Sequence, residues 1–321
     1  MLYIPSTTGA RFYNMPDRDI WMNEKRLVKT ERQEPSVTTK LSVWPKGARF
    51  QNWLASQDDL FAAEKKRDEG GARGTRVHRA VEDMMYGDHY GFEAYADKYF
   101  SGETPEERQE RAAHEWQRVT SFVNWWNDYD QPTIVHRRSG VPAIECEMYS
   151  WQHGFAGTTD AVYTGGKFGN LRVMVDYKTS VDIFDSFWAQ LSAYFWAWHE
   201  MEEESIDAIA SLKLACDSKG QPKYVFKMID SKKEIQARFE DFLACSRIWK
   251  RHREFEKKST TERTMIAIEP LLKIDKLAER VVKEQEAWEM PKNVLKKESA
   301  SPASQLKGSE VKQEKAEIDV L

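Results

Sequence analysis

The sequence predicts an α/β fold, in which strands in the middle of the chain alternate with helices. Three segments with the composition of strands follow one another closely, at 142–149, 155–163 and 171–178. After them come a helical segment dense in Phe and Trp and then two more strand-like segments, at 185–199, 206–214 and 223–229.

The helix expected at 105–128 has the clearest start. Thr104 can cap it, Pro105 suits the first helical position, and Glu107 completes a capping box. A long helix is also expected from Lys233 onward.

The N-terminal part of the chain is less regular. Residues 35–45 are rich in Val and Thr and predict a short extended piece, whereas residues 50–66 predict a helix. Gly70–Gly71 is expected to interrupt the helical structure before a new helix at 73–87.

The C-terminal part changes in composition. A helix is expected at 270–288, and the chain after Pro291 has no aromatic residue, which indicates a disordered tail. Its end, Glu317–Leu321, is a place where a protein partner could dock. We therefore expect a lead-in segment, a core, a C-terminal helix and a tail, at 1–60, 61–260, 261–290 and 291–321.

Composition narrows the class of protein. The net charge of -4 over 321 residues excludes a protein that is basic overall, so nucleic-acid binding would depend on local patches such as Lys250–Arg253. That run fits a solvated helix face equally well.

The three cysteines form no CxxC pair, which argues against an iron–sulfur cluster and fits a reducing compartment. We expect a cytoplasmic protein, since no secretory signal and no membrane-length apolar run occurs.

Asp176 and Lys178 are the first candidates for chemistry. Side chains two apart on a strand share a face, so both are expected to point into the same space. A carboxylate can bind a divalent cation, and a neighbouring ammonium can orient a hydroxide. The triplet alone is a weak signal, because Asp217–Lys219 matches it too, but Asp176 follows the apolar run Val173–Val175 and is expected to be buried.

Asp160 is the second carboxylate, on the preceding strand of a predicted hairpin with a glycine-rich turn. Paired strands lie about 4.8 Å apart. Asp160 and Asp176 would therefore repel each other unless a cation lies between them. The alternative is two exposed acids at strand ends.

Three further positions could complete the site. His78 lies near the start of a helix, and a neutral imidazole is a good metal ligand, although a lone helical histidine is more often structural. Glu145 and Glu147 are two apart on a strand; either one adds a carboxylate to the site or both form a solvent-facing pair.

Gln190 and Tyr194 are spaced i, i+4 and share a helix face. Gln190 could bind a phosphate or Lys178. Tyr194 could contact a nucleic-acid backbone or stack on a base, or it could be core packing.

Taken in order, these pieces resemble the RecB-type branch of the PD-(D/E)XK nucleases. The resemblance covers about residues 73–195 and rests on five motifs: Gly74-x-x-x-His78, the acidic strand at Glu145, Gly157-Thr-x-Asp160, Asp176-Tyr-Lys178-Thr-Ser, and Gln190-x-x-x-Tyr194. Residues 35–43 also resemble the lead-in of phage and mitochondrial single-strand exonucleases of this branch.

The resemblance implies a restriction-endonuclease-like fold: a mixed central β-sheet flanked by helices, with extra N- and C-terminal helices. It implies that Lys178 positions the attacking water and that Mg²⁺ or Mn²⁺ is bound by His78, Asp160, Asp176 and the Tyr177 carbonyl. It places an auxiliary set near the DNA: Glu145, Gln190, Tyr194, Thr179 and Ser180.

The chain departs from the family pattern in three ways. Thr159 replaces the Pro of the family name, and the second acid, Asp176, replaces Glu, which the branch allows. The four cysteines of its iron–sulfur members are missing, so no such cluster is expected.

The resemblance implies a metal-dependent DNA nuclease. We expect an exonuclease acting on DNA ends or single strands in recombination, repair or replication of a phage or bacterial genome. The alternatives are a structure-specific endonuclease and a non-catalytic DNA-binding recombination partner.

Overall fold

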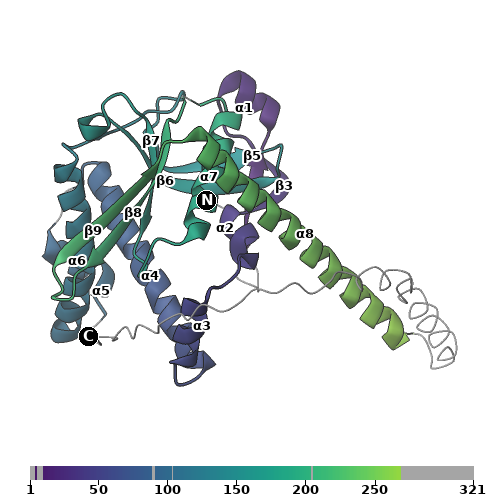
Figure 1. Cartoon of the computed structure of the whole chain (residues 1–321), viewed down its shortest axis with the longest axis horizontal. Helices are drawn as coiled ribbons and strands as arrows, with labels where there is room; N and C mark the ends of the chain where they lie inside the picture. Colours follow the sequence, from purple (N-terminus) through teal and green to yellow (C-terminus); the bar gives the residue numbers. More distant parts are fainter. Residues whose placement is uncertain (1–3, 6–9, 89–90, 103, 204, 269–321) are drawn as a thin grey trace, which may run out of the picture. The chain divides into compact units, whose positions relative to one another are not determined.

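A six-stranded sheet forms the centre of the fold (Figure 1). The computed structural model describes residues 4–5, 10–88, 91–102, 104–203 and 205–268. The strand order is β4-β6-β7-β8-β9, and β5 pairs with β6 on the side where β4 also pairs. The strands are β4 Thr133–Ile134, β5 Ile144–Ser150, β6 Phe155–Thr164, β7 Val173–Lys178, β8 Ala208–Cys216 and β9 Pro222–Ile229.

The sheet is mixed because one connection crosses over. β7 and β8 are parallel and are joined through helix α7 (Asp185–Glu200), whereas the other pairs are antiparallel. The glycine-rich turn between β6 and β7 holds the short 3₁₀ helix η2 (Gly166–Phe168). The predicted α/β class, mixed sheet and five strand segments are confirmed, with strand ends shifted by at most two residues.

Helices cover both faces of the sheet (Figure 1). On one face, α4 (Leu60–Met85), α5 (Phe92–Phe100) and α6 (Pro105–Asp128) bury a cluster that includes Trp125. On the other, α7 and the first turns of α8 (Lys232–Ile268) bury a cluster that includes Trp198. The predicted helix 105–128 is confirmed, with its capping box formed by Thr104 and Glu107. Helix α7, predicted at 185–199, is mainly core.

The N-terminal elements form a second, three-stranded sheet that joins the main one. Its order is β1-β2-β3, and an isolated bridge pairs Ser36 with Ala156 of β6. The elements of this region are β1 Ile4–Pro5, β2 Arg11–Pro16, α1 Arg18–Glu24, β3 Lys29–Pro35, α2 Val37–Lys40, the 3₁₀ helix η1 Leu41–Val43 and α3 Ala48–Ala55.

The extended piece predicted at 35–45 is wrong. This stretch forms α2 and η1, because the Ser36 side chain accepts from the Thr39 N–H and caps the turn. Val37 and Leu41 are buried in the core on successive helical turns. Val and Thr content predicted a strand, but capping and burial favour the helix.

The break predicted at Gly70–Gly71 is also wrong. Helix α4 runs through both glycines. A helical glycine costs only about 1 kcal/mol relative to alanine, which an otherwise continuous hydrogen-bonded helix can tolerate. The break comes earlier, between α3 and α4, where Asp59 caps α4 by accepting from the Ala62 N–H.

The chain divides into two units, residues 1–257 and 258–321. Of the second unit, the structure describes only the continuation of α8 to Ile268, so the helix predicted at 270–288 and the tail 291–321 lie outside the described residues. No helix in the described part of the chain is long and apolar enough to cross a membrane.

Candidate metal centre

The candidate centre lies where β6 and β7 stop pairing. Their register pairs Ala161 with Val175 and, continued by one residue, places Asp160 opposite Asp176. Instead of a further backbone pair, Asp160 Oδ2 accepts the Tyr177 N–H at 2.5 Å. β6 continues by pairing with β5, so the two carboxylates lie at the point where the strands part. Both side chains are buried. The structure thus brings Asp160 and Asp176 to adjacent positions on β6 and β7.

Helix α7, which covers one face of the sheet, contacts both Asp176 and Lys178. Lys178 Nζ lies 2.5 Å from Asp176 Oδ2. Gln190 contacts both, since its Nε2 is 3.4 Å from Asp176 Oδ1 and its Oε1 accepts from Lys178 Nζ at 3.3 Å. Gln190 also donates to the Tyr194 hydroxyl at 3.0 Å. Gln190 and Tyr194 therefore share a helix face, as predicted, and through Gln190 this face contacts Asp176 and Lys178.

His78 reaches the centre from helix α4. Its Nδ1 lies 3.3 Å from Asp160 Oδ1. The approach is close because residue 74 is glycine: a Cβ at Gly74 would lie 3.1 Å from Thr179 Oγ1, just after β7. A larger residue there would push α4 away from the end of the strand.

Glu145 is the third carboxylate of the centre. His78, Glu145 and Asp160 each offer a ligand atom within 4.8 Å of the other two, which is the spacing of a metal-binding cluster. Glu147 does not join them, since it pairs with Lys29 at 2.5 Å and accepts from the Tyr149 hydroxyl. Of the two glutamates that the sequence left equivalent, the structure brings only Glu145 to the site.

Electrostatics distinguish the three acids. Burial, reinforced by the charge of Asp160, raises the pKa of Glu145 to about 8. Burial also raises the pKa of Asp176 to about 6, against the charge of Lys178. Burial would raise the pKa of Asp160 as well, but the charge and hydrogen bond of His78 hold it below the usual value. His78 responds in the opposite sense: burial lowers its pKa, and Asp160 more than compensates, so the pKa of His78 is raised.

The remaining predicted residues have structural contacts. The Tyr177 side chain lies in the core beneath α4, α5 and α6, where its hydroxyl is 2.5 Å from that of Tyr163. Thr179 lies against Gly74, and the Ser180 hydroxyl donates to the Asp182 carbonyl.

Two residues near the centre were not predicted. The aromatic ring of Phe187 on α7 lies 4.5 Å from Lys178 Nζ. Ser211 on β8 is the register partner of Asp176, and its buried hydroxyl has no hydrogen-bond partner among the described residues. Nothing in the sequence marks either residue, because strand register across a helical crossover is a property of the fold.

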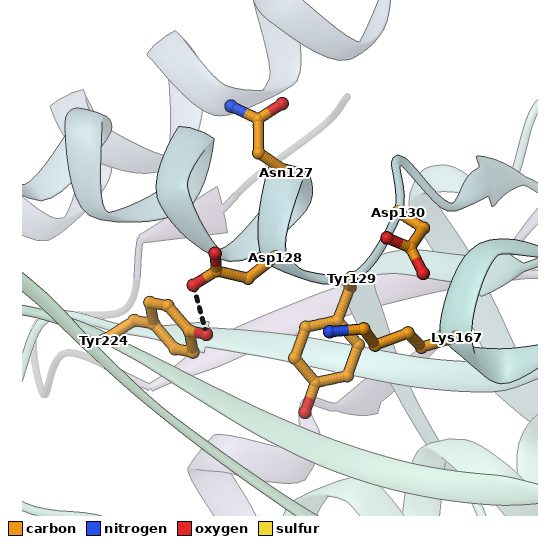
Figure 2. Close-up of a pocket in the computed structure, with 6 residues that line it drawn as sticks. All are labelled: Asn127, Asp128, Tyr129, Asp130, Lys167 and Tyr224. Atoms are coloured by element: carbon orange, nitrogen blue, oxygen red, sulfur yellow. Dashed lines mark hydrogen bonds between the residues drawn. The ribbon is translucent and has the colours of Figure 1, made fainter.

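A pocket of about 810 Å³ lies elsewhere on the surface (Figure 2). It is formed by the end of α6, the turn after β6 and β9. Figure 2 shows Tyr224 bonded to Asp128, with Lys167 beside Tyr129. None of the residues of the candidate centre lines it.

Comparisons with known proteins add little to this geometry. No protein-family model and no curated protein matches the chain. Among solved structures, an alkaline exonuclease (LHK-Exo) from Laribacter hongkongensis is similar at 10% identity, covering 71% of this chain and 93% of its own, with a TM-score of 0.32. The protein SSO0001 is similar at 14% identity, covering 53% and 73%, with a TM-score of 0.22. At these TM-scores neither likeness carries an inference about this chain.

Proposed function

We propose that this protein is a nuclease that hydrolyses the phosphodiester bonds of DNA with the help of a divalent cation. One observation carries the proposal: Asp160 and Asp176 meet where β6 and β7 part, with Lys178 held against one of them and His78 against the other. Acids of this kind, beside a lysine, suit the hydrolysis of a phosphate ester.

The donor set fits Mg²⁺ or Mn²⁺. Carboxylate oxygens with at most one imidazole are ligands for hard divalent cations, and no cysteine contributes to the cluster of His78, Glu145 and Asp160. Asp176 is not part of that cluster, since its Oδ2 is paired with Lys178 Nζ at 2.5 Å, so a cation bound here would share this carboxylate with Lys178. Three acids so close together are costly unless positive charge offsets them. A bound cation would offset phosphate charge and lower the pKa of a water molecule.

Lys178 and Tyr177 would then have separate roles in the reaction. Lys178 Nζ, fixed by Asp176 and Gln190, would donate to the attacking water or to a phosphate oxygen. The Tyr177 N–H orients the Asp160 carboxylate toward the centre. The Tyr177 carbonyl would be a further ligand of the cation.

We further propose an exonuclease that acts on DNA ends or single strands, in keeping with the family resemblance. A covalently closed circular substrate separates this function from a structure-specific endonuclease, because only the endonuclease should cut the circle. A non-catalytic DNA-binding protein would show neither activity, and calorimetric titration with Mn²⁺ would then report no tight site.

Replacement of the acid and the lysine tests the proposal. Asp176→Asn and Lys178→Ala should each lower Mg²⁺-dependent DNA degradation by about 10²-fold or more, since each removes charge placed at the reacting phosphate. The matched controls are Asp217→Asn and Lys219→Ala, which change the same kind of triplet in an exposed turn where Asp217 accepts backbone N–H groups. Full activity in a correctly folded Asp176→Asn protein would refute the assignment.

A further inference from the structure

A second concentration of charge lies between helices α4 and α6, which pack against each other. It contains Arg73 and Arg76 on α4, and His114 and Arg118 on α6. One buried carboxylate, Glu115, faces them. Positive charge therefore exceeds negative charge in this region.

The one carboxylate is already fully engaged. Arg76 binds both oxygens of Glu115, at 2.9 and 2.6 Å, and the Tyr95 hydroxyl donates to it at 3.0 Å. Arg73 and Arg118 are left without an acidic partner among the residues that the structure describes. The Nε–H groups of both are buried and have no hydrogen-bond partner in the same residues.

Arg73 and Arg118 each lie one helical turn from the Arg76–Glu115 pair that joins α4 to α6, three residues away on its own helix. Arg118 Nη1 donates to the His114 carbonyl at 2.8 Å, within its own helix. Burial lowers the pKa of Arg118, and the charge of Arg73 lowers it further. The same two arginines also add to the effect of burial in lowering the pKa of His114. Like charges that are half-buried together destabilise a fold unless an anion offsets them. The guanidinium fork is the group that best matches phosphate geometry.

This cluster lies at the same edge of the sheet as the candidate metal centre. β7 and β8 are parallel, so Lys178 and Cys216 end at one edge. Arg118 Nη1 lies 3.6 Å from Cys216 Sγ, and Gly74, next to Arg73, lies against Thr179. The partner of Lys178 on β8 is Lys213, three residues before Cys216, which corresponds to about 10 Å along the strand. A single nucleic-acid strand of a few nucleotides is long enough to reach both places.

We propose that Arg73 and Arg118 form an anion-binding site for a backbone phosphate of the nucleic acid, a few nucleotides from the bond cleaved at the metal centre. The position relative to the cleaved bond rests on the proposed function, whereas the phosphate site itself does not. The contact is to the backbone, so it holds the strand without reading its sequence.

DNA binding in EDTA tests the site without cleavage. Fluorescence anisotropy with a short single-stranded oligonucleotide, over a salt series, would compare wild type with Arg73→Gln/Arg118→Gln. We expect the double variant to bind about tenfold more weakly and the slope of log K against log salt to fall by about 0.7, the value for one single-strand phosphate contact. Arg73→Lys/Arg118→Lys keeps the charge without the fork and should bind with intermediate affinity.

The matched control is Arg67→Gln/Arg108→Gln. It removes the same charge from the same two helices, at residues that pair with Asp68 and Asp97. The control should keep the wild-type slope. Equal slopes in the control and in Arg73→Gln/Arg118→Gln would overturn the proposal, as would a wild-type protein that binds no DNA.

A structural role would give a different result. If the arginines only stabilise the helix pair, Arg73→Gln/Arg118→Gln should lower the thermal unfolding midpoint; we expect it to stay at or above the wild-type value, because repulsion is removed. The single variants Arg73→Gln and Arg118→Gln, each expected to lower the slope, provide the test if the double variant does not fold. Inorganic phosphate that raises the midpoint only when both arginines are present, with an unchanged DNA slope, would assign the site to a free anion and overturn the nucleic-acid assignment.

Failure of the two proposals can be told apart. If wild type degrades DNA but Arg73→Gln/Arg118→Gln binds like the control, the phosphate site is refuted and the nuclease stands. If no degradation occurs but DNA binding depends on the arginines, the nuclease is refuted and the phosphate site stands.

Discussion

Glu145 has a backbone φ of 45°, in the left-handed region that non-glycine residues rarely adopt. The Glu145 side chain lies in the cluster with His78 and Asp160, while β5 keeps its register with β6 on both sides of this residue. Strain of this kind persists where the surrounding structure requires it, and it is often found at functional sites. Glu147, two residues on, is paired with Lys29 instead.

The strain at Glu145 can be measured. Glu145→Gly should be more stable than Glu145→Ala by about 1 kcal/mol, because only glycine adopts this φ without a steric cost. At Glu147, whose φ is not positive, the order should reverse, with glycine less stable than alanine by about 0.5–1 kcal/mol. Urea unfolding of the four variants gives both differences. Alanine as stable as glycine at position 145 would show that the strain is absent.

At the scale of elements, the contact between α7 and β6 fixes the centre. A Cβ at Gly157 would lie 2.3 Å from Cε1 of Tyr194, so the ring of Tyr194 packs directly on the strand backbone. The Tyr194 hydroxyl accepts from Gln190, which in turn contacts Asp176 and Lys178. The glycine of the Gly157-Thr-x-Asp160 motif thus determines how closely the supporting helix approaches the acids.

A double-mutant cycle tests this contact. Gly157→Ala should destabilise the protein by about 1–3 kcal/mol through overpacking. The loss should shrink by about 1 kcal/mol or more when Tyr194→Ala is already present, because the clashing ring is gone. Gly71→Ala on α4 is the control: nothing lies within 4 Å of its added Cβ, so it should be neutral or stabilising by up to about 1 kcal/mol. Additive losses at Gly157 and Tyr194 would contradict the close approach.

At the scale of the whole molecule, the candidate centre links stability to pH and to divalent cations. Without a cation, the folded-state pKa is about 8 for Glu145 and about 6 for Asp176, and it is raised for His78. Each of these values lies above that of the unfolded chain, so the folded protein binds more protons in between. Stability should therefore fall as pH rises through this range. Within the centre, Asp160, whose pKa is lowered, acts in the opposite direction, at lower pH. Outside the centre, the lowered pKa values of His114, His153 and His199 also act in that direction.

Thermal unfolding after treatment with EDTA should show this dependence. The midpoint should fall between pH 6 and pH 8, as Glu145 loses its proton. Mn²⁺ should raise it again, more at pH 8 than at pH 6, because protons compete for the same ligands. A concentration of 100 times Kd adds about 2.7 kcal/mol. Glu145→Gln should flatten the fall and Glu147→Gln should not. No response to Mn²⁺ at pH 8 would argue against a metal centre.

The sequence by itself predicted strands β5 to β9 and placed Asp160 and Asp176 on neighbouring strands. A hairpin is a local structure, so the glycine-rich turn and the alternation of the strands are sufficient to bring these acids together. The capping box of α6 is local in the same way. Local patterns failed at 35–45 and at Gly70–Gly71, where capping and packing decided the structure. The helix predicted at 50–66 is interrupted between α3 and α4, and the sheet β1-β2-β3 and helix α5 were not predicted.

Only the tertiary structure decided the rest of the centre. His78, Glu145 and Gln190 come from three different elements, and their meeting depends on how α4, β5 and α7 pack on the sheet. The contact of Glu147 with Lys29 depends on how β3 lies beside β5, and the approach of Arg73 and Arg118 depends on the packing of α4 against α6. Long-range contacts of this kind leave no period or spacing in the chain, because they are set by the burial of whole faces and not by neighbouring residues.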